Sequence, residues 1–203
     1  MNKLAATLLL LLGAPLAAMA GPVTNLVSNG SFETDPMTSG SWSIYSKLSG
    51  WTGGSAGIEL RDNVSGTASD GINFVELDTT SNSSMSQTIN TLLGQWYLLT
   101  FDFSNRPGTA ASTNGLAWSF GNSSGFTPEQ AVISGDNQWQ HFSTMVQGTG
   151  SSMTLSFSAT GTSDGYGSAL DKVSVSAVPE PGSLALAGSG LLGVGFAMRR
   201  RRD

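Results

Sequence analysis

Hydrophobic and polar residues alternate with a period of two over much of the middle of the chain. The clearest run is WYLLTFDFS at 96–104, in which Tyr97, Leu99, Phe101 and Phe103 share one parity. In SMTLSFS at 152–158, every second residue is again large and apolar. Successive side chains of a β-strand point to opposite faces, so these runs predict strands with one buried and one wet face.

Similar short runs recur between clusters of Gly, Ser, Asn and Asp, which are typical turn residues. We expect about nine strands, at 25–28, 57–61, 72–78, 84–90, 96–104, 116–121, 138–146, 152–158 and 169–176. Antiparallel strands with one buried face pack as a two-sheet sandwich, and a jelly roll of about eight strands fits this number. The predicted fold class is therefore all-β, an antiparallel β-sandwich of the jelly-roll type over residues 21–177.

The N-terminus follows a different pattern. Lys3 precedes an uncharged apolar run, Leu4–Leu12, and Ala18-Met19-Ala20 follows. A basic start, an apolar core of this length and an A-x-A site are typical of a secretory signal peptide. We expect signal peptidase to remove residues 1–20, so that the mature chain begins at Gly21. The alternative is a buried N-terminal helix.

The C-terminus carries a second apolar run. Ser183–Met198 is sixteen residues long and has no charge. A membrane-spanning helix needs about 20 residues, with a range of about 17 to 25, so this run predicts a short transmembrane helix. Four basic residues follow it: Arg199, Arg200, Arg201 and Arg202. The positive-inside rule places them in the cytoplasm, which suits temporary anchorage in the inner membrane. An ordinary single-span anchor is the alternative.

Residues 178–203 as a whole resemble a known signal. The sequence Val178-Pro179-Glu180-Pro181, then the apolar segment, then the arginine cluster is similar to a PEP-CTERM sorting signal. The resemblance implies a Gram-negative, exopolysaccharide-producing bacterium. It also implies processing near the PEP motif by an exosortase, a membrane transpeptidase of the cysteine type. We therefore expect an exported chain that is anchored in the inner membrane for a time and then reaches the cell surface or the extracellular matrix.

Composition narrows the function of the 21–177 domain. About 160 residues are enough for one domain with its own core, and the absence of cysteine excludes disulfides and cysteine-based metal sites. The domain has twelve acidic side chains and only four basic ones, namely Lys47, Arg61, Arg106 and Lys172. Nucleic acid requires basic patches, so it is excluded as a partner. The acidity is compatible with calcium or neutral glycans, and solvation alone also explains it.

The same domain resembles the choice-of-anchor C family and its plant cell-wall relatives. The matching motifs are NLVSNGSFE at 25–33, FVELD at 74–78 and GSALDKVSV at 167–175, in the same order along nearly the whole domain. The resemblance implies a galactose-binding-like jelly roll. Relatives usually have Pro and then Asp or Asn where this chain has Ser168 and Lys172. Because this fold hosts many functions, the resemblance names no ligand.

Two acidic residues are candidates for a structural metal. Asp171 shares the parity of Val173 and Val175, so its carboxylate points inward if the valines do. A buried carboxylate is costly unless it is paired or bound to a metal. Galactose-binding-like carbohydrate modules often hold calcium between an N-terminal Phe-Glu and a C-terminal Asp, and by this resemblance Glu33 and Asp171 match. We expect these two residues to bind Ca²⁺, and two hydrogen-bonded acids are the alternative.

Five tryptophans are a generous supply for one domain. Sugar rings stack on exposed aromatic faces while nearby polar groups bind the hydroxyls. Trp51 lies between Gly50 and a Gly-rich turn, and Trp96 has the opposite parity from the apolar stripe of its strand. We expect Trp51 and Trp96 to be exposed and to bind carbohydrate, and the core to take at least three of the five.

Catalytic chemistry has little support. Residues 121–125 fit G-x-S-x-G, but that motif needs a strand–turn–helix elbow and this copy lies in a Gly- and Ser-rich β-region. His141, the only histidine, lies in a β-run. Glu76 and Asp78 share a strand face and could pair in glycoside hydrolysis, but such acids are common on solvated strands.

We therefore expect no enzyme. The predicted function is an exported module that binds carbohydrate or exopolysaccharide. A structural extracellular protein without a small ligand and a polysaccharide hydrolase are the alternatives.

Overall fold

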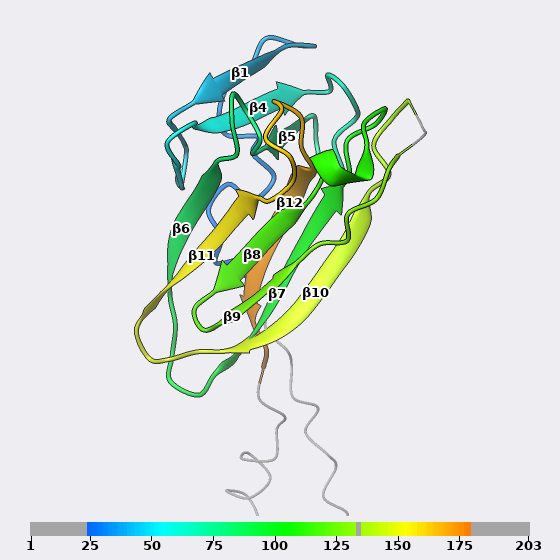
Figure 1. The fold of residues 1–203 in the computed structure, drawn as a ribbon. Coiled ribbons are helices and arrows are strands. Elements are labelled where there is room, and N and C mark those ends of the chain that lie inside the picture. Colours follow the sequence, from blue (N-terminus) through cyan, green and yellow to red (C-terminus); the bar gives the residue numbers. More distant parts are fainter. Residues whose placement is uncertain (1–23, 133–134, 180–203) are drawn as a thin grey trace, which may run out of the picture. The chain divides into compact units, whose positions relative to one another are not determined.

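The computed structural model describes residues 24–132 and 135–179. Within them, twelve strands form two six-stranded antiparallel sheets that face each other (Figure 1). The first sheet has the order β1 (Trp42–Tyr45), β4 (Ile58–Asp62), β5 (Asn73–Glu76), β12 (Ala169–Ala177), β7 (Trp96–Ser104), β10 (Gln140–Gln147). The second has the order β2 (Lys47–Leu48), β3 (Trp51–Gly53), β6 (Ser84–Asn90), β11 (Ser152–Ala159), β8 (Leu116–Phe120), β9 (Ser123–Phe126). The predicted all-β sandwich is thus confirmed.

One short 3₁₀ turn, η1 (Ala111–Thr113), is the only helix among these residues. None of the helices in the described part of the chain is long and apolar enough to cross a membrane. The predicted signal peptide, the C-terminal hydrophobic helix and the residues from Glu180 onward lie outside the described residues. Val23–Val178 form one compact unit.

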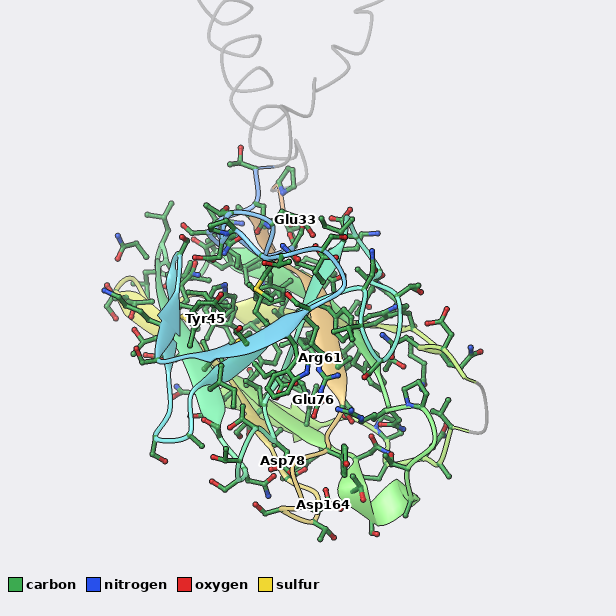
Figure 2. All side chains as sticks on the ribbon, turned by 90° about the horizontal axis from the view of Figure 1, so that it is seen from above. Glu33, Tyr45, Arg61, Glu76, Asp78 and Asp164 are labelled. Carbon is green, nitrogen blue, oxygen red and sulfur yellow. The ribbon has the colours of Figure 1, made fainter. Side chains whose placement is uncertain are left out.

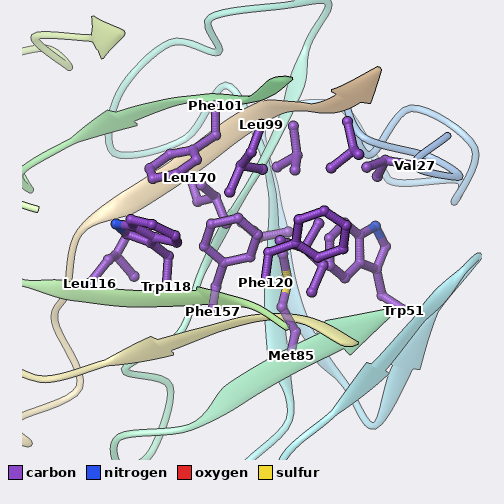
Figure 3. Close-up of a cluster of buried hydrophobic side chains, with 14 of the residues drawn as sticks. Val27, Trp51, Met85, Leu99, Phe101, Leu116, Trp118, Phe120, Phe157 and Leu170 are labelled. Carbon is purple, nitrogen blue, oxygen red and sulfur yellow. The ribbon is translucent and has the colours of Figure 1, made fainter. Parts of the chain in front are cut away.

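The core lies between the two sheets (Figure 3). The predicted stripes are confirmed: alternate residues of β7 and of β11 are buried and face each other. Phe101 of β7 meets Phe157 of β11 edge-on, with ring centroids 5.1 Å apart. Burial of a side chain of this size contributes about 1.5 to 3 kcal/mol, so the facing stripes hold the sandwich together without disulfides.

Eight of the nine predicted strands overlap an observed strand. The exception is 25–28, which runs beside β12 without forming a regular ladder. Leu26 N donates to Val175 O at 2.8 Å, and the Asn25 side chain bonds the backbone of Val173 and Val175. The first and last segments of the domain thus meet through backbone hydrogen bonds and through the Asn25 side chain.

The pattern also missed four strands, β1, β2, β3 and β9. They have between two and four residues each, too few to show a period of two, and β3 and β9 also have the Gly, Ser and Thr content of loops. Their pairing with longer neighbours, such as β1 with β4 and β9 with β8, forms them. Short edge strands are therefore set by the sheet they join and not by their own pattern.

Candidate ligand-binding pocket

Three turns, β6–β7, β8–β9 and β10–β11, lie at one end of the sandwich (Figure 1). The β6–β7 turn reverses at Gly94, whose φ of 77° is in the left-handed region that glycine adopts without strain. Gly94 N donates to Gly148 O at 2.9 Å, and Gly148 N donates to Gln95 O at 2.8 Å. These bonds join two of the turns and hold Leu93 and Trp96 in place.

A pocket of about 550 Å³ opens at this end. Its apolar lining residues are Leu93, Trp96, Met145 and Val146, and its other lining residues are Asn122, Ser123, Gln147, Gly148 and Thr149. Ligand sites in proteins usually have about 300 to 1,000 Å³, mostly apolar walls and a few polar groups. The pocket has both the size and the mixed lining of such a site, and none of its residues is charged.

Trp96 forms one wall of this pocket and is 47% exposed, so its predicted exposure is confirmed. Its neighbour across the ladder is Gln147, whose side-chain amide donates one hydrogen to Gly94 O at 3.2 Å. The Trp96 carbonyl accepts a hydrogen bond from Val178 N at 2.9 Å, which secures the first residue of β7 against the end of the domain. An aromatic face is thus held beside amide and hydroxyl groups.

The expectation for Trp51 was wrong. Its ring is 2% exposed and lies between Phe32 and Phe157, at centroid distances of 5.9 and 6.2 Å. Its indole Nε1 donates to Asn29 O at 3.1 Å, so the polar atom is satisfied inside the core. The flanking glycines do mark a turn, but β3 pairs with β2 and β6, and this pairing turns the ring inward. A role in ligand binding would require an accessible face.

Two of the five tryptophans, Trp51 and Trp118, are buried in the core, where at least three were expected. Trp118 is buried, Trp139 is half-buried, and Trp42 is 53% exposed on β1. Sequence reasoning did not nominate Trp42, because the short run at 42–45 was not recognised as a strand. Exposure alone does not make a site. Among the described residues, none of those in β1 lines one of the three pockets.

The two residues predicted to bind Ca²⁺ already have hydrogen-bond partners. Glu33 Oε1 accepts from the backbone N–H groups of Ile72 and Asn73, at 2.9 and 2.7 Å. Both oxygens of Asp171 accept as well, Oδ2 from Ser69 N and Asp70 N and Oδ1 from Lys172 N. No group of three or more His, Cys, Asp or Glu in residues 24–132 and 135–179 is arranged to hold a metal ion.

Calcium binds about six to eight oxygens, and three of the four carboxylate oxygens here are occupied by amide hydrogens. A calcium ion shared by Glu33 and Asp171 would have to compete with these hydrogen bonds. The arrangement favours the alternative, two hydrogen-bonded acids, and calcium stays a prediction. Burial raises the pKa of Asp171 to about 7, against the lowering effect of its three backbone donors.

The burial of Asp171 is as expected, but its face is not. The register of β12 against β7 shifts between Asp171 and Ser174, and Lys172 has a φ of 53°. Such a β-bulge inserts one residue and reverses the alternation beyond it. Val175 stays opposite the core residue Leu99, whereas Asp171 pairs with Asp102 on the other face of the sheet. The shared parity of Asp171, Val173 and Val175 therefore predicted the wrong face of the sheet for the Asp171 side chain.

Four charged residues form what we call the buried charged cluster: Glu59, Arg61, Glu76 and Arg106. Arg61 contacts Glu59 and lies 3.3 Å from Glu76, and Arg106 Nη1 lies 2.6 Å from the same Glu76 Oε2. Figure 2 shows Arg61 and Glu76 side by side. The Arg106 guanidinium also lies 4.6 Å from the ring centroid of Tyr166.

Buried charges often mark a functional site, but the charged groups of this cluster contact one another and so have a structural role. Burial raises the pKa of Glu76 to about 7, although the Arg61 and Arg106 guanidiniums act to lower it. Burial also raises the pKa of Glu59. Since the carboxylates are 2% and 4% exposed and face arginines, they compensate buried charge and offer little to a ligand.

The hydrolase candidates do not assemble. The G-x-S-x-G run at 121–125 covers the turn between β8 and β9 and the start of β9, so a strand and not a helix follows the turn. His141 Nδ1 lies 2.7 Å from Asp102 Oδ1. Glu76 and Asp78 are both buried, contrary to the expectation of a solvated strand. Glu76 faces Arg106, and Asp78 accepts hydrogen bonds from Asp164 N and Gly165 N (Figure 2). Each candidate acid thus already has a partner.

Residues 25–176 match the family described as Protein of unknown function (DUF642). The chain belongs to this family. Directly after the DUF642 domain, residues 177–202 match the PEP-CTERM protein-sorting motif. The match confirms the sorting signal predicted from Val178–Pro181 and the arginine cluster. No curated protein matches the chain.

The DUF642 domain is also similar to solved structures. One is TmCBM61 in complex with β-1,4-galactotriose, at 15% identity and a TM-score of 0.47, over 75% of this chain and 97% of that one. A second is the Family 16 Carbohydrate Binding Module-2, at 13% and 0.48, over 74% and 99%. A third is the CBM22-1 xylan-binding domain from Paenibacillus barcinonensis Xyn10C, at 13% and 0.42, over 72% and 100%.

Proposed function

We propose that this protein is an exported carbohydrate-binding protein of the cell surface or extracellular matrix. Its ligand is a polysaccharide, in the first place the producer's own exopolysaccharide. The observation that carries the proposal is Trp96, an exposed aromatic wall of a pocket of about 550 Å³ that also holds amide and hydroxyl side chains. The apolar C–H surface of a sugar ring packs on the indole, and the polar groups bind its hydroxyls.

The charges of the site favour a neutral sugar. The pocket is uncharged, while the domain around it carries twelve acidic side chains against four basic ones. An anionic polymer such as a uronate would meet repulsion from this field and no basic partner within the pocket. Hydroxyl-rich neutral hexoses suit Asn122, Ser123 and Gln147.

Replacement of Trp96 by Ala tests the proposal. Binding of the full chain to the producer's exopolysaccharide should be lost, as measured by pull-down or a glycan array. The free energy of unfolding should change by no more than about 0.5 kcal/mol, because the ring is at the surface. Trp42→Ala is the matched control, since it removes an equally exposed tryptophan from β1 and should leave binding intact.

Trp51→Ala, by contrast, should lower the free energy of unfolding by about 3 to 5 kcal/mol, because it removes a buried side chain and leaves a cavity. The carbohydrate proposal would be refuted if the wild-type chain bound neither the producer's exopolysaccharide nor any glycan of the array. It would also be refuted if Trp96→Ala bound as well as the wild type. The chain would then be a structural extracellular protein without a small ligand.

The PEP-CTERM motif implies export and sorting at the membrane. We further propose cleavage by an exosortase-like transpeptidase near Val178–Pro181, after signal peptidase has acted at the N-terminus. Glu180→Ala should then leave uncleaved precursor in the inner membrane of the producing cell, which mass spectrometry of the membrane fraction detects. Mature protein of unchanged mass and location in this variant would contradict cleavage at the motif.

A further inference from the structure

The end of the sandwich that holds the pocket also exposes apolar side chains. Leu92 and Leu93, at the apex of the β6–β7 turn, are 70% and 83% exposed, and Trp96 beside them is 47% exposed. We call these three residues the apolar tip. Two adjacent leucines this exposed, next to an exposed tryptophan, form the kind of surface that contacts an apolar partner.

The tip lies in a region without charge. The turns at this end, 90–96, 121–124 and 147–152, contain no Asp, Glu, Lys, Arg or His. The twelve acidic residues of the domain all lie outside them. Because an acidic side chain at a lipid surface must lose part of its hydration, an uncharged end is the part of this domain that can approach lipid at the least cost.

The chain leaves the domain at this same end. β12 ends at Ala177, and the next residue is held beside Trp96: Val178 N donates to Trp96 O at 2.9 Å, and Gln95 Nε2 donates to Val178 O at 2.6 Å. Only four residues, 179–182, separate Val178 from the apolar segment Ser183–Met198. A fully extended chain spans at most about 18 Å between Val178 and Ser183.

We propose that the apolar tip lies in the interfacial layer of the membrane while the sorting signal is still attached. The headgroup layer is about 5 to 8 Å deep on each side of the hydrocarbon, so the tether keeps Val178 within reach of it. Tryptophan is enriched at this depth because its ring is amphipathic, and apolar side chains enter the acyl boundary. The contact concerns the precursor and does not require the carbohydrate proposal to hold. Trp96 belongs to both sites, and processing, which releases the domain from the membrane, would free its face for a glycan.

Tryptophan quenching in vesicles tests the contact. The full chain with its sorting signal is reconstituted into vesicles of phosphatidylcholine, with or without bromine on the upper acyl carbons. All five tryptophans lie in the DUF642 domain, so any quenching by bromine reports the domain and not the tail. We expect quenching of the wild type, loss of most of it in Trp96→Phe, and its full retention in the matched control Trp42→Phe.

The double variant Leu92→Ser/Leu93→Ser keeps all five tryptophans and should also lose most of the quenching. Circular dichroism of both tip variants should match the wild type, because the altered side chains are at the surface. Equal quenching of wild type and Trp96→Phe, or none in the wild type, would overturn the proposal. A third outcome would also overturn it. If the leucine variant were not processed in cells, and wild-type Trp96 were not quenched in vesicles, the tip would bind the processing enzyme and not the membrane.

Discussion

Strand β12 joins two contrasting ends of the domain. At its start, Ala169 pairs with Glu76 of the buried charged cluster, and Asp171 is buried under backbone donors. At its other end, about 26 Å away at strand rise, Ala177 leads to Val178 beside the uncharged apolar tip. The first end buries charge and satisfies it internally; the second exposes apolar surface and holds the pocket. The contrast indicates that the charged cluster is a structural part of the domain, and we propose partner contacts only at the other end.

Substitution of one residue at each end gives the largest expected effect. Arg61→Met should lower the free energy of unfolding by about 3 to 5 kcal/mol, because it leaves Glu59 and Glu76 buried without one of their cations. Leu93→Ser at the tip should change it by no more than about 0.5 kcal/mol. Urea denaturation of the two variants measures both values, and similar losses at the two ends would break the comparison.

The pH dependence of stability should come from the charged end. The pKa of Glu76 is raised from 4.5 to about 7 in the folded chain, so the folded state holds a proton that the unfolded state releases. Its contribution is complete below about pH 4.5 and is lost as the pH rises through about 7. Asp171 acts in the same direction from 3.8 to about 7.

The free energy of unfolding should therefore be greater at pH 5 than at pH 8, by about 1.4 kcal/mol for each unit of pKa difference that the range covers. Glu76→Gln keeps the size of the side chain and removes its titration, so this variant should show a smaller difference between the two pH values. Stability that rises steadily from pH 5 to pH 8 would show that the arginines outweigh burial at Glu76.

Calcium should have the smallest effect. Three of the four carboxylate oxygens of Glu33 and Asp171 accept hydrogen bonds from backbone N–H groups, so these acids have partners without a metal. The melting temperature in a chelator should then equal that in excess calcium. A calcium ion bound to the native state would instead stabilise it by about 2.7 kcal/mol at 100 times its Kd, which a calorimetric scan detects. Such a shift, absent in Glu33→Gln, would confirm the predicted site.

Features that lie within one continuous stretch of the chain were readable from the sequence. The alternation in 96–104 and 152–158 determined two central strands and their buried faces, because a pleated strand in a sandwich must bury one side. The tripartite order of the C-terminus identified the sorting signal, since the PEP motif, apolar segment and arginines are contiguous. The exposure of Trp96 followed from its parity within one regular strand.

Tertiary structure decided what depends on partners distant in the sequence. Trp51 was misplaced because β2 and β6, and not its flanking glycines, determine which way its ring points. Asp171 was assigned to the wrong face because a bulge at Lys172 reverses the alternation, and its partners Ser69 and Asp70 lie about a hundred residues away. The pocket required three turns that meet only in the fold, because side chains near the ends of strands gather through topology and not through spacing along the chain.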